Sequence, residues 1–215
     1  MKKFAIILSG CGVYDGSEIH EATLTMLAIK KFGADYEVFA PDMMQHHVVN
    51  HITGEEMPEK RNVLIESARI ARGKIKSLTA LNPAEFDALI LPGGSGAAKN
   101  LSTYAFDGSN LKVIDILTEK LRAAHKLKKA IGALCIAPVI LAKIFEGTQL
   151  TIGTDKETAA AIESIGGNHI PTNSGDVIYD HHNNIFSTPC YMLQNNIYEI
   201  AIGCENIVKA MLEKM

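Results

Sequence analysis

The sequence of 215 residues has little of what several classes of protein need: it has four cysteines, no tryptophan and a net charge of only -3. Surfaces that bind nucleic acid or anionic lipid depend on an excess of lysine and arginine, which this composition lacks. No apolar run approaches the roughly 20 residues that a membrane-spanning helix needs. The apolar stretch at 4–8 is too short for a signal peptide and predicts a buried strand. We therefore expect neither nucleic acid nor a membrane as a partner.

The four cysteines are widely separated and include no C-x-x-C pair. This spacing favours neither a zinc site nor a disulfide framework, and it is typical of a protein in a reducing compartment. We therefore expect a cytoplasmic protein. The adjacent histidines at 46–47 and 181–182 give poor geometry for chelation, because neighbouring side chains usually point to different sides. We expect no bound metal ion.

What the sequence does contain is a regular alternation of short apolar runs and helical patterns. The apolar runs predict strands at 4–8, 36–40, 87–91 and 130–134, and helices are predicted at about 17–31, 111–126 and 137–145. Strands that are apolar on every residue must be covered on both faces, which indicates a parallel sheet between two layers of helices. The prediction is one α/β domain, 1–215, with a doubly wound, mainly parallel sheet.

Two segments fit this alternation less well. The first, about 41–81, contains a charged helical pattern at 59–72, and we interpret it as a helical insertion after the second strand. A lid, a dimer surface and a sheet edge are all compatible with its composition. The second, 168–188, is rich in Asn, His, Asp and Gly and predicts a β-hairpin before a C-terminal helix at about 191–215.

Ligands of doubly wound sheets bind beyond the carboxyl ends of the strands, and three loops with unusual residues follow such ends here. These loops, at 9–16, 92–97 and 134–136, should converge on one pocket. The third contains Cys135 at a predicted junction of strand, sharp turn and helix. A thiol on such an elbow is exposed, and the dipole of the following helix favours its thiolate. The alternative interpretation is that Cys135 is a small buried hydrophobic residue.

Two carboxylates could assist a reactive cysteine. Glu18 and Glu21 are three residues apart at the start of the first helix, so both can face the strand ends. They could instead simply complement the helix dipole, with Ser17 as the N-cap. His20 lies between them on another face. Whether His20, or Cys11 in the first loop, enters the pocket stays open.

The turn after the third predicted strand is rich in glycine. Its Gly93 and Gly94 allow the backbone to approach a ligand closely, so an amide there could donate to a substrate oxygen. The spacing of its glycines matches neither a P-loop nor a dinucleotide-binding fingerprint. Binding of phosphate or a dinucleotide is therefore disfavoured.

Several motifs together carry a resemblance to a known family. They are the turn at 91–94, the elbow at 132–138, the acidic first helix that ends at Gly33, and the segments 8–21, 54–56, 61–64 and 68–73. With these motifs the chain resembles the class I glutamine-amidotransferase-like superfamily, in the branch of the PfpI-type peptidases and deglycases. Within that branch it is most similar to the bacterial ElbB glyoxalases, the "enhancing lycopene biosynthesis" proteins, over nearly its whole length.

The resemblance implies a flavodoxin-like fold, no cofactor, a homodimer and a glyoxalase III-type lyase activity. Such an enzyme converts glyoxal or methylglyoxal to glycolate or lactate without glutathione. By resemblance Cys135 is the nucleophile, Glu21 is the carboxylate that contacts it, and Gly94 and Ile136 supply oxyanion-binding amides. Gly93 and Glu18 complete the expected substrate-binding set, and Glu18 would tune Glu21.

The sequence also departs from the peptidases and amidotransferases of this superfamily. Ile136 follows the cysteine where those enzymes have a histidine, and no His-x-Glu occurs in the last third of the chain. His169, His181 and His182 remain open as late partners of the cysteine. Four alternatives to a glyoxalase therefore stay open: a cysteine hydrolase, a redox or stress-response thiol protein, a chaperone-like binder, and a protein that supports isoprenoid biosynthesis.

Overall fold

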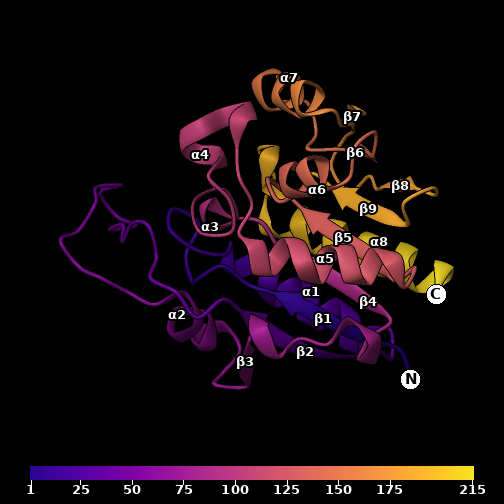
Figure 1. Cartoon of the computed structure of the whole chain (residues 1–215), viewed down its shortest axis with the longest axis horizontal. Helices are drawn as coiled ribbons and strands as arrows, with labels where there is room; N and C mark the ends of the chain where they lie inside the picture. The colour runs from indigo at the N-terminus through magenta and orange to yellow at the C-terminus, as the bar shows by residue number, and fades with distance from the viewer.

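A computed structural model describes all 215 residues. At its centre is a seven-stranded sheet with the order β3-β2-β1-β4-β5-β9-β8 (Figure 1). All neighbouring strands in it are parallel except β8 and β9. The strands are β1 (Lys3–Ile7), β2 (Asp35–Ala40), β3 (Ile75–Ser77), β4 (Ala88–Leu91), β5 (Ala130–Leu134), β8 (Ile178–Asp180) and β9 (Ile185–Thr188). The predicted mainly parallel α/β fold is confirmed.

Helices cover both faces of the sheet. One face packs on α5 and α6, and the other packs on α1 and α8 (Figure 1). The helices are α1 (Ile19–Lys31), α2 (Val63–Ile70), α3 (Ser95–Lys99), α4 (Tyr104–Asp107), α5 (Asp115–Lys126), α6 (Pro138–Ile144), α7 (Lys156–Ile165) and α8 (Ile197–Lys214). None of them is both long and apolar enough to cross a membrane.

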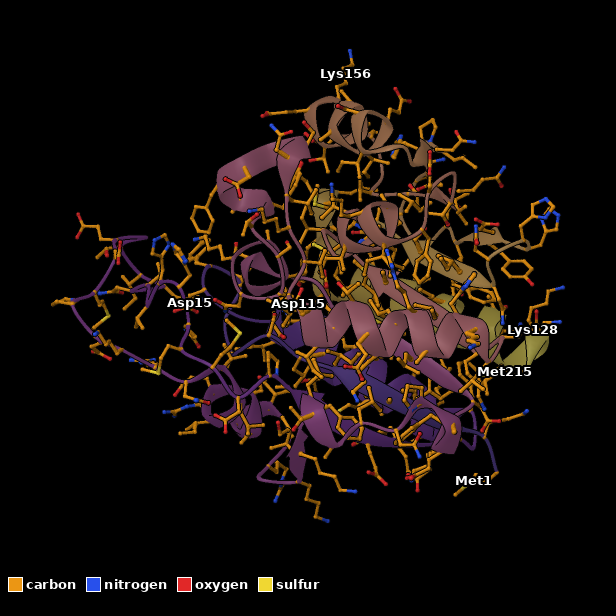
Figure 2. All side chains as sticks on the ribbon, viewed as in Figure 1. Met1, Asp15, Asp115, Lys128, Lys156 and Met215 are labelled. Carbon is orange, nitrogen blue, oxygen red and sulfur yellow. The ribbon has the colours of Figure 1, made fainter.

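The two layers follow from the pattern of the central strands. Every residue of β4 and β5 is buried, and each strand contributes side chains to both apolar cores. In Figure 2, Asp15, which follows β1, and Lys128, which precedes β5, mark opposite ends of the sheet. The functional loops predicted from the sequence all lie at the Asp15 end, because parallel strands place their carboxyl ends together.

The segment 41–81 contains the expected helix, α2, but it also contains a strand of the central sheet. Its first part is a long connection that extends away from the body of the fold (Figure 1). Its last part includes β3, which pairs in parallel with β2 and forms an edge of the sheet. The helix is shorter than the predicted 59–72, since the Asn62 side chain caps its start and Arg72 and Gly73 have positive φ after its end.

The C-terminal third contains the predicted hairpin in a shorter form. Strands β8 and β9 pair antiparallel, whereas β7 (Asn168–His169) pairs with β6 (Gln149–Leu150) in a separate two-stranded sheet. The last helix begins at Ile197 rather than near 191. A 3₁₀ turn, η4 (Cys190–Met192), precedes it, and a capping box between Asn196 and Glu199 starts it.

Candidate active site

Cys135 lies at the sharp turn between β5 and α6. Its φ is +59°, in the left-handed region that costs a residue with a Cβ about 1 kcal/mol or more. The surrounding backbone holds this conformation, since the Cys135 N–H donates to the Thr188 carbonyl at 3.0 Å. A Cβ at Gly93 would lie 2.4 Å from the Cys135 Cβ, so only glycine allows the β4–α3 turn to approach the elbow this closely.

Glu21, in the first turn of α1, is fully buried beside this cysteine. Its carboxyl oxygens accept N–H groups from Gly93 at 2.8 Å and from Tyr191 at 3.3 Å, and its side chain lies beside the Cys135 thiol. The structure thus brings together residues from α1, the β4–α3 turn and the β5–α6 elbow. These are residues that the sequence placed at one edge of the sheet.

Burial raises the pKa of the Glu21 carboxyl to about 7. The Gly93 and Tyr191 amides lower the pKa, but the neighbouring Glu18 carboxylate adds to the rise. Because no lysine, arginine or histidine forms an ion pair with it, Glu21 changes its protonation state near neutral pH. A carboxyl group with that property is suited to accept and return protons under physiological conditions.

The expectation that the elbow favours a thiolate is wrong for the resting structure. Burial, followed by the nearby Glu21 carboxylate, raises the pKa of Cys135 well above that of an ordinary thiol. The N–H groups of Gly94 and Ile136 point at the sulfur and lower its pKa, but they do not outweigh burial. The sequence pattern shows the helix after the turn, whereas the desolvation of the thiol depends on the packed tertiary structure. Two adjacent buried acids share at most one negative charge, so forming the thiolate requires transfer of its proton to Glu21.

Glu18, and not Ser17, is the N-cap of α1. The Glu18 carboxylate accepts the Glu21 N–H at 2.7 Å and is almost fully buried. The Ser17 hydroxyl instead accepts the Ser9 N–H at 2.8 Å and so ties the first loop to β1. A Cβ at Gly94 would lie 2.3 Å from the Glu18 N, so this loop packs directly on the glycine turn. The predicted convergence of the first two loops is therefore present.

Cys11 lies in the same loop but in different surroundings. Its side chain is partly exposed, and its pKa is raised by burial and next by the Glu66 carboxylate of α2. Arg69 and Asp15 also act on it. The charged groups around Cys11 thus belong to α2, to the connection before it and to its own loop, while the one beside Cys135 belongs to α1.

Comparisons with known proteins identify the family of the chain. The sequence model of the DJ-1/PfpI family matches residues 12–159. The chain belongs to the DJ-1/PfpI family. The predicted resemblance to the glutamine-amidotransferase-like superfamily is thereby confirmed.

Several relatives match over nearly the whole chain. The mitochondrial ES1 protein homolog of Rattus norvegicus is 44% identical, over 98% of this chain and 83% of the relative. The mitochondrial glutamine amidotransferase-like class 1 domain-containing protein 3 of Homo sapiens is 43% identical, over 98% and 82%. The crystal structure of an isoprenoid biosynthesis protein with an amidotransferase-like domain from Ehrlichia chaffeensis matches with a TM-score of 0.92 and 36% identity, over 99% of this chain and all of that one.

These relatives contradict the expectation of a cytoplasmic protein. The rat and human proteins, which align over 98% of this chain, are mitochondrial. Unpaired cysteines distinguish a reducing compartment from an oxidising one, but they do not distinguish one reducing compartment from another. The expected homodimer is not tested by the single chain and stays a prediction.

The late histidines of this DJ-1/PfpI chain do not complete a cysteine–histidine pair at the elbow. His181 and His182 follow β8 and precede β9, at the end of the sheet where β9 and β5 begin, whereas Cys135 follows the other end of β5. His169 lies in β7, where burial lowers its pKa and the Gly153 carbonyl and the Glu163 carboxylate raise it by a smaller amount. The groups that act on the Cys135 thiol are Glu21 and backbone amides.

Tyr191 is the site residue that the sequence did not reveal. Its N–H donates to Glu21, and its hydroxyl forms a 2.8 Å hydrogen bond with the His20 Nδ1. The sequence placed Tyr191 at the start of a regular helix, whereas it lies in η4, in the separate turn before α8. Pro189 directly before Cys190 is the one local signal of that turn.

Proposed function

We propose that this protein is a cofactor-independent glyoxalase that converts glyoxal or methylglyoxal to the corresponding 2-hydroxy acid. One observation carries the proposal: a fully buried carboxyl group, with no cation to hold its charge, contacts the elbow thiol. Two backbone N–H groups point at the same sulfur. This arrangement supplies a nucleophile, a group that moves protons and donors for an oxyanion, which are the parts that the reaction needs.

The reaction begins when the ionised Glu21 takes the proton of the Cys135 thiol. The sulfur then forms a bond to the aldehyde carbon, and the carbonyl oxygen becomes an oxyanion. The Gly94 and Ile136 amides would stabilise this charge, and Glu21 returns its proton to the oxygen. The product is a neutral hemithioacetal on Cys135.

The second stage moves hydrogen between the two substrate carbons. Glu21 removes the hydrogen of the former aldehyde carbon as a proton, and the electron pair left behind forms a double bond to the adjacent carbon, whose carbonyl oxygen takes the negative charge of an enediolate. The hydroxyl proton on the first carbon moves to this second oxygen, and Glu21 returns its proton to the adjacent carbon, which gives a thioester beside an alcohol. The first carbon is oxidised and the second is reduced by the same electron pair, so no external oxidant is needed. Water then cleaves the thioester, releasing the hydroxy acid and the free thiol.

The charge of the site favours an uncharged substrate. Glu21 is fully buried beside the thiol and has no cationic partner, and the carboxylate of Glu18, which is almost fully buried, lies next to Glu21. A carboxylate on the substrate would meet this negative potential without compensation. We therefore propose small neutral dicarbonyls rather than anionic oxoacids such as glyoxylate as the substrate class.

The same features disfavour the alternative functions of the Cys135 site. A peroxide-sensing thiol needs a low pKa and good access, whereas Cys135 has a raised pKa and is 7% exposed. A cysteine hydrolase would need a partner such as an imidazole, while the group in contact with this thiol is a carboxyl. The Ehrlichia relative is an isoprenoid biosynthesis protein, but no residue of this site points to that chemistry.

The test is a substrate panel of methylglyoxal, glyoxal and glyoxylate with the purified protein and without glutathione. Lactate and glycolate should form from the two neutral dicarbonyls, and glyoxylate should react at least about ten-fold more slowly because of the buried carboxylates. Cys135→Ala should abolish turnover. Absence of lactate with the wild-type protein, or unchanged turnover in Cys135→Ala, would contradict the proposal.

A further inference from the structure

A second hydrogen-bonded pair lies next to the Cys135–Glu21 pair and has no role in the chemistry above. The Tyr191 hydroxyl and the His20 Nδ1 are 2.8 Å apart, and they join η4 to the first turn of α1. The His20 ring is about half exposed, and its Nδ1 lies 3.9 Å from the Glu18 carboxylate. The pair thus lies between solvent and the buried carboxyl groups.

Tyr191 is attached to α1 at two neighbouring points. Its backbone N–H donates to the Glu21 carboxyl, and its side chain binds His20, the residue directly before Glu21. Both contacts therefore join η4 to the first turn of α1. Loss of the outer contact would therefore leave the inner contact, which is 3.3 Å long, to hold the turn by itself.

The turn that carries Tyr191 is strained. Cys190 has a φ of +43°, which is unfavourable for a residue with a Cβ and persists only where contacts hold it. Its carbonyl accepts the Asn195 side chain at 3.0 Å and the Leu193 N–H at 3.2 Å. These contacts lie on the C-terminal side of the turn. On the α1 side, the two contacts of Tyr191 keep its amide directed at the carboxyl.

We propose that His20 and Tyr191 are positioning residues, whose mutual hydrogen bond keeps the Tyr191 amide on the Glu21 carboxyl and thereby sets the pH at which that carboxyl ionises. The catalytic consequence rests on the proposed function, but the effect on Glu21 does not. An N–H donor favours the ionised form of a carboxyl group. Releasing the amide therefore moves the ionisation of Glu21 to higher pH.

Other titratable groups surround Glu21, and none of them replaces this donor. Glu18 is on its own helix, and Cys135 faces it from the elbow. Behind it lie Cys190 of η4 and Cys204 of α8, whose Sγ is 3.7 Å from the Glu21 carbonyl. All of these groups are acids, so their ionisation would raise the pKa of Glu21. The opposing effects come from hydrogen-bond donors, and Tyr191 supplies one of the two backbone N–H groups.

The test compares Tyr191→Phe and His20→Ala with the wild-type protein by two measurements. The first is the titration of the Glu21 carboxyl carbon in protein labelled with ¹³C at glutamate, its signal assigned with Glu21→Gln. We expect both variants to shift its midpoint upward by about half to one pH unit, the range expected for one lost hydrogen bond. The second is the pH profile of kcat/KM for methylglyoxal. It should fall about three- to ten-fold at pH 6 and approach the wild-type value above pH 8.5.

Two further variants serve as controls. His20→Gln keeps a side chain that can bond the phenol, so its midpoint should return toward that of the wild-type protein. Tyr198→Phe removes a hydroxyl from a residue that is 72% exposed, and it should change neither measurement. Circular dichroism confirms that each variant is folded.

An unchanged Glu21 midpoint in folded Tyr191→Phe would overturn the inference, as would an equal loss of kcat/KM at every pH. If the wild-type protein does not turn over dicarbonyls, the proposed function fails. The carbon titration still decides the role of Tyr191 and His20 in that case.

Discussion

Two thiols lie at the same end of the sheet, each beside a buried carboxyl group, yet their surroundings differ in one decisive respect. Glu21, beside Cys135, has no cationic partner, and its pKa rises to about 7. Glu66, beside Cys11, pairs with the Arg69 Nε at 2.8 Å and with Arg61 at 3.7 Å. The charge of Glu66 is therefore already neutralised by arginines. A carboxyl group next to a thiol becomes a useful base only where no cation holds its charge.

The difference originates in the elements that surround each thiol. Helix α2 and the connection before it carry the arginines that face Glu66, and these side chains are partly exposed. Around Glu21, the neighbours are backbone amides, cysteines and another carboxylate. We therefore expect the two chemically similar pairs to differ in reactivity because of what packs around them.

The sharpest contrast is expected between two matched substitutions. Glu21→Gln keeps the shape of the buried side chain but removes the base, and it should lower kcat/KM for methylglyoxal by about 100-fold or more. Glu66→Gln should keep nearly full activity, since Glu66 lies beside Cys11 rather than Cys135. Steady-state kinetics of both purified variants measure this difference. Equal losses in the two variants would remove the distinction between the two pairs.

The same two substitutions should have opposite effects on stability. The pKa of Glu21 is raised from 4.5 to about 7, so the folded state disfavours its ionised form, and stability is lost as pH rises from about 4.5 to 7. Glu21→Gln lacks this penalty and should be more stable than the wild-type protein by about 3 kcal/mol at pH 8. Glu66→Gln breaks ion pairs and should cost about 1 kcal/mol at the same pH.

Urea unfolding at pH 5 and pH 8 measures both effects. The advantage of Glu21→Gln should fall to about 1 kcal/mol at pH 5, where the wild-type carboxyl is protonated in the folded state but still mostly ionised in the unfolded state. A Glu21→Gln variant that is less stable than the wild-type protein at pH 8 would show that the buried carboxylate carries no such penalty.

Substitution of the glycine that lies closest to the elbow should have a smaller effect on activity than Glu21→Gln. Gly93→Ala places a Cβ against Cys135, and we expect it to destabilise the protein by about 1–3 kcal/mol and to lower activity by displacing the Gly93 amide from Glu21. Gly147→Ala is the matched control. Its φ is +74° but its Cβ would meet nothing within 4 Å, so it should cost only about 1 kcal/mol and leave activity unchanged. Thermal unfolding and the methylglyoxal assay of the two variants test this. Equal activity in both variants would mean that the contact at the elbow is not needed.

The sequence predicted that Cys135, Glu21 and the glycine turn lie close together, because their proximity follows from the direction of parallel strands alone. Strands β4 and β5 are apolar runs that end abruptly at the glycine turn and at the elbow, and the carboxyl ends of parallel strands lie at one edge of the sheet. The resemblance to a known family then selected Glu21 from the acidic residues of the first helix.

What the sequence could not provide depends on packing between distant segments. The raised pKa of Cys135 comes from burial by several elements, so the local helix pattern suggested the opposite direction. Tyr191 reaches Glu21 only because η4 folds back on α1, 170 residues away in the chain. The short strand β3 has three residues, too few for a periodic pattern.

The central claim is that Glu21, which has no cationic partner, takes the proton of Cys135. The dependence of kcat/KM for methylglyoxal on pH tests it most directly, with wild-type protein and Cys11→Ala measured side by side. Both profiles should rise through pH about 7, where the pair begins to supply a base. A rate that rises only above about pH 9, with the ionisation of an unassisted thiol, would contradict the claim.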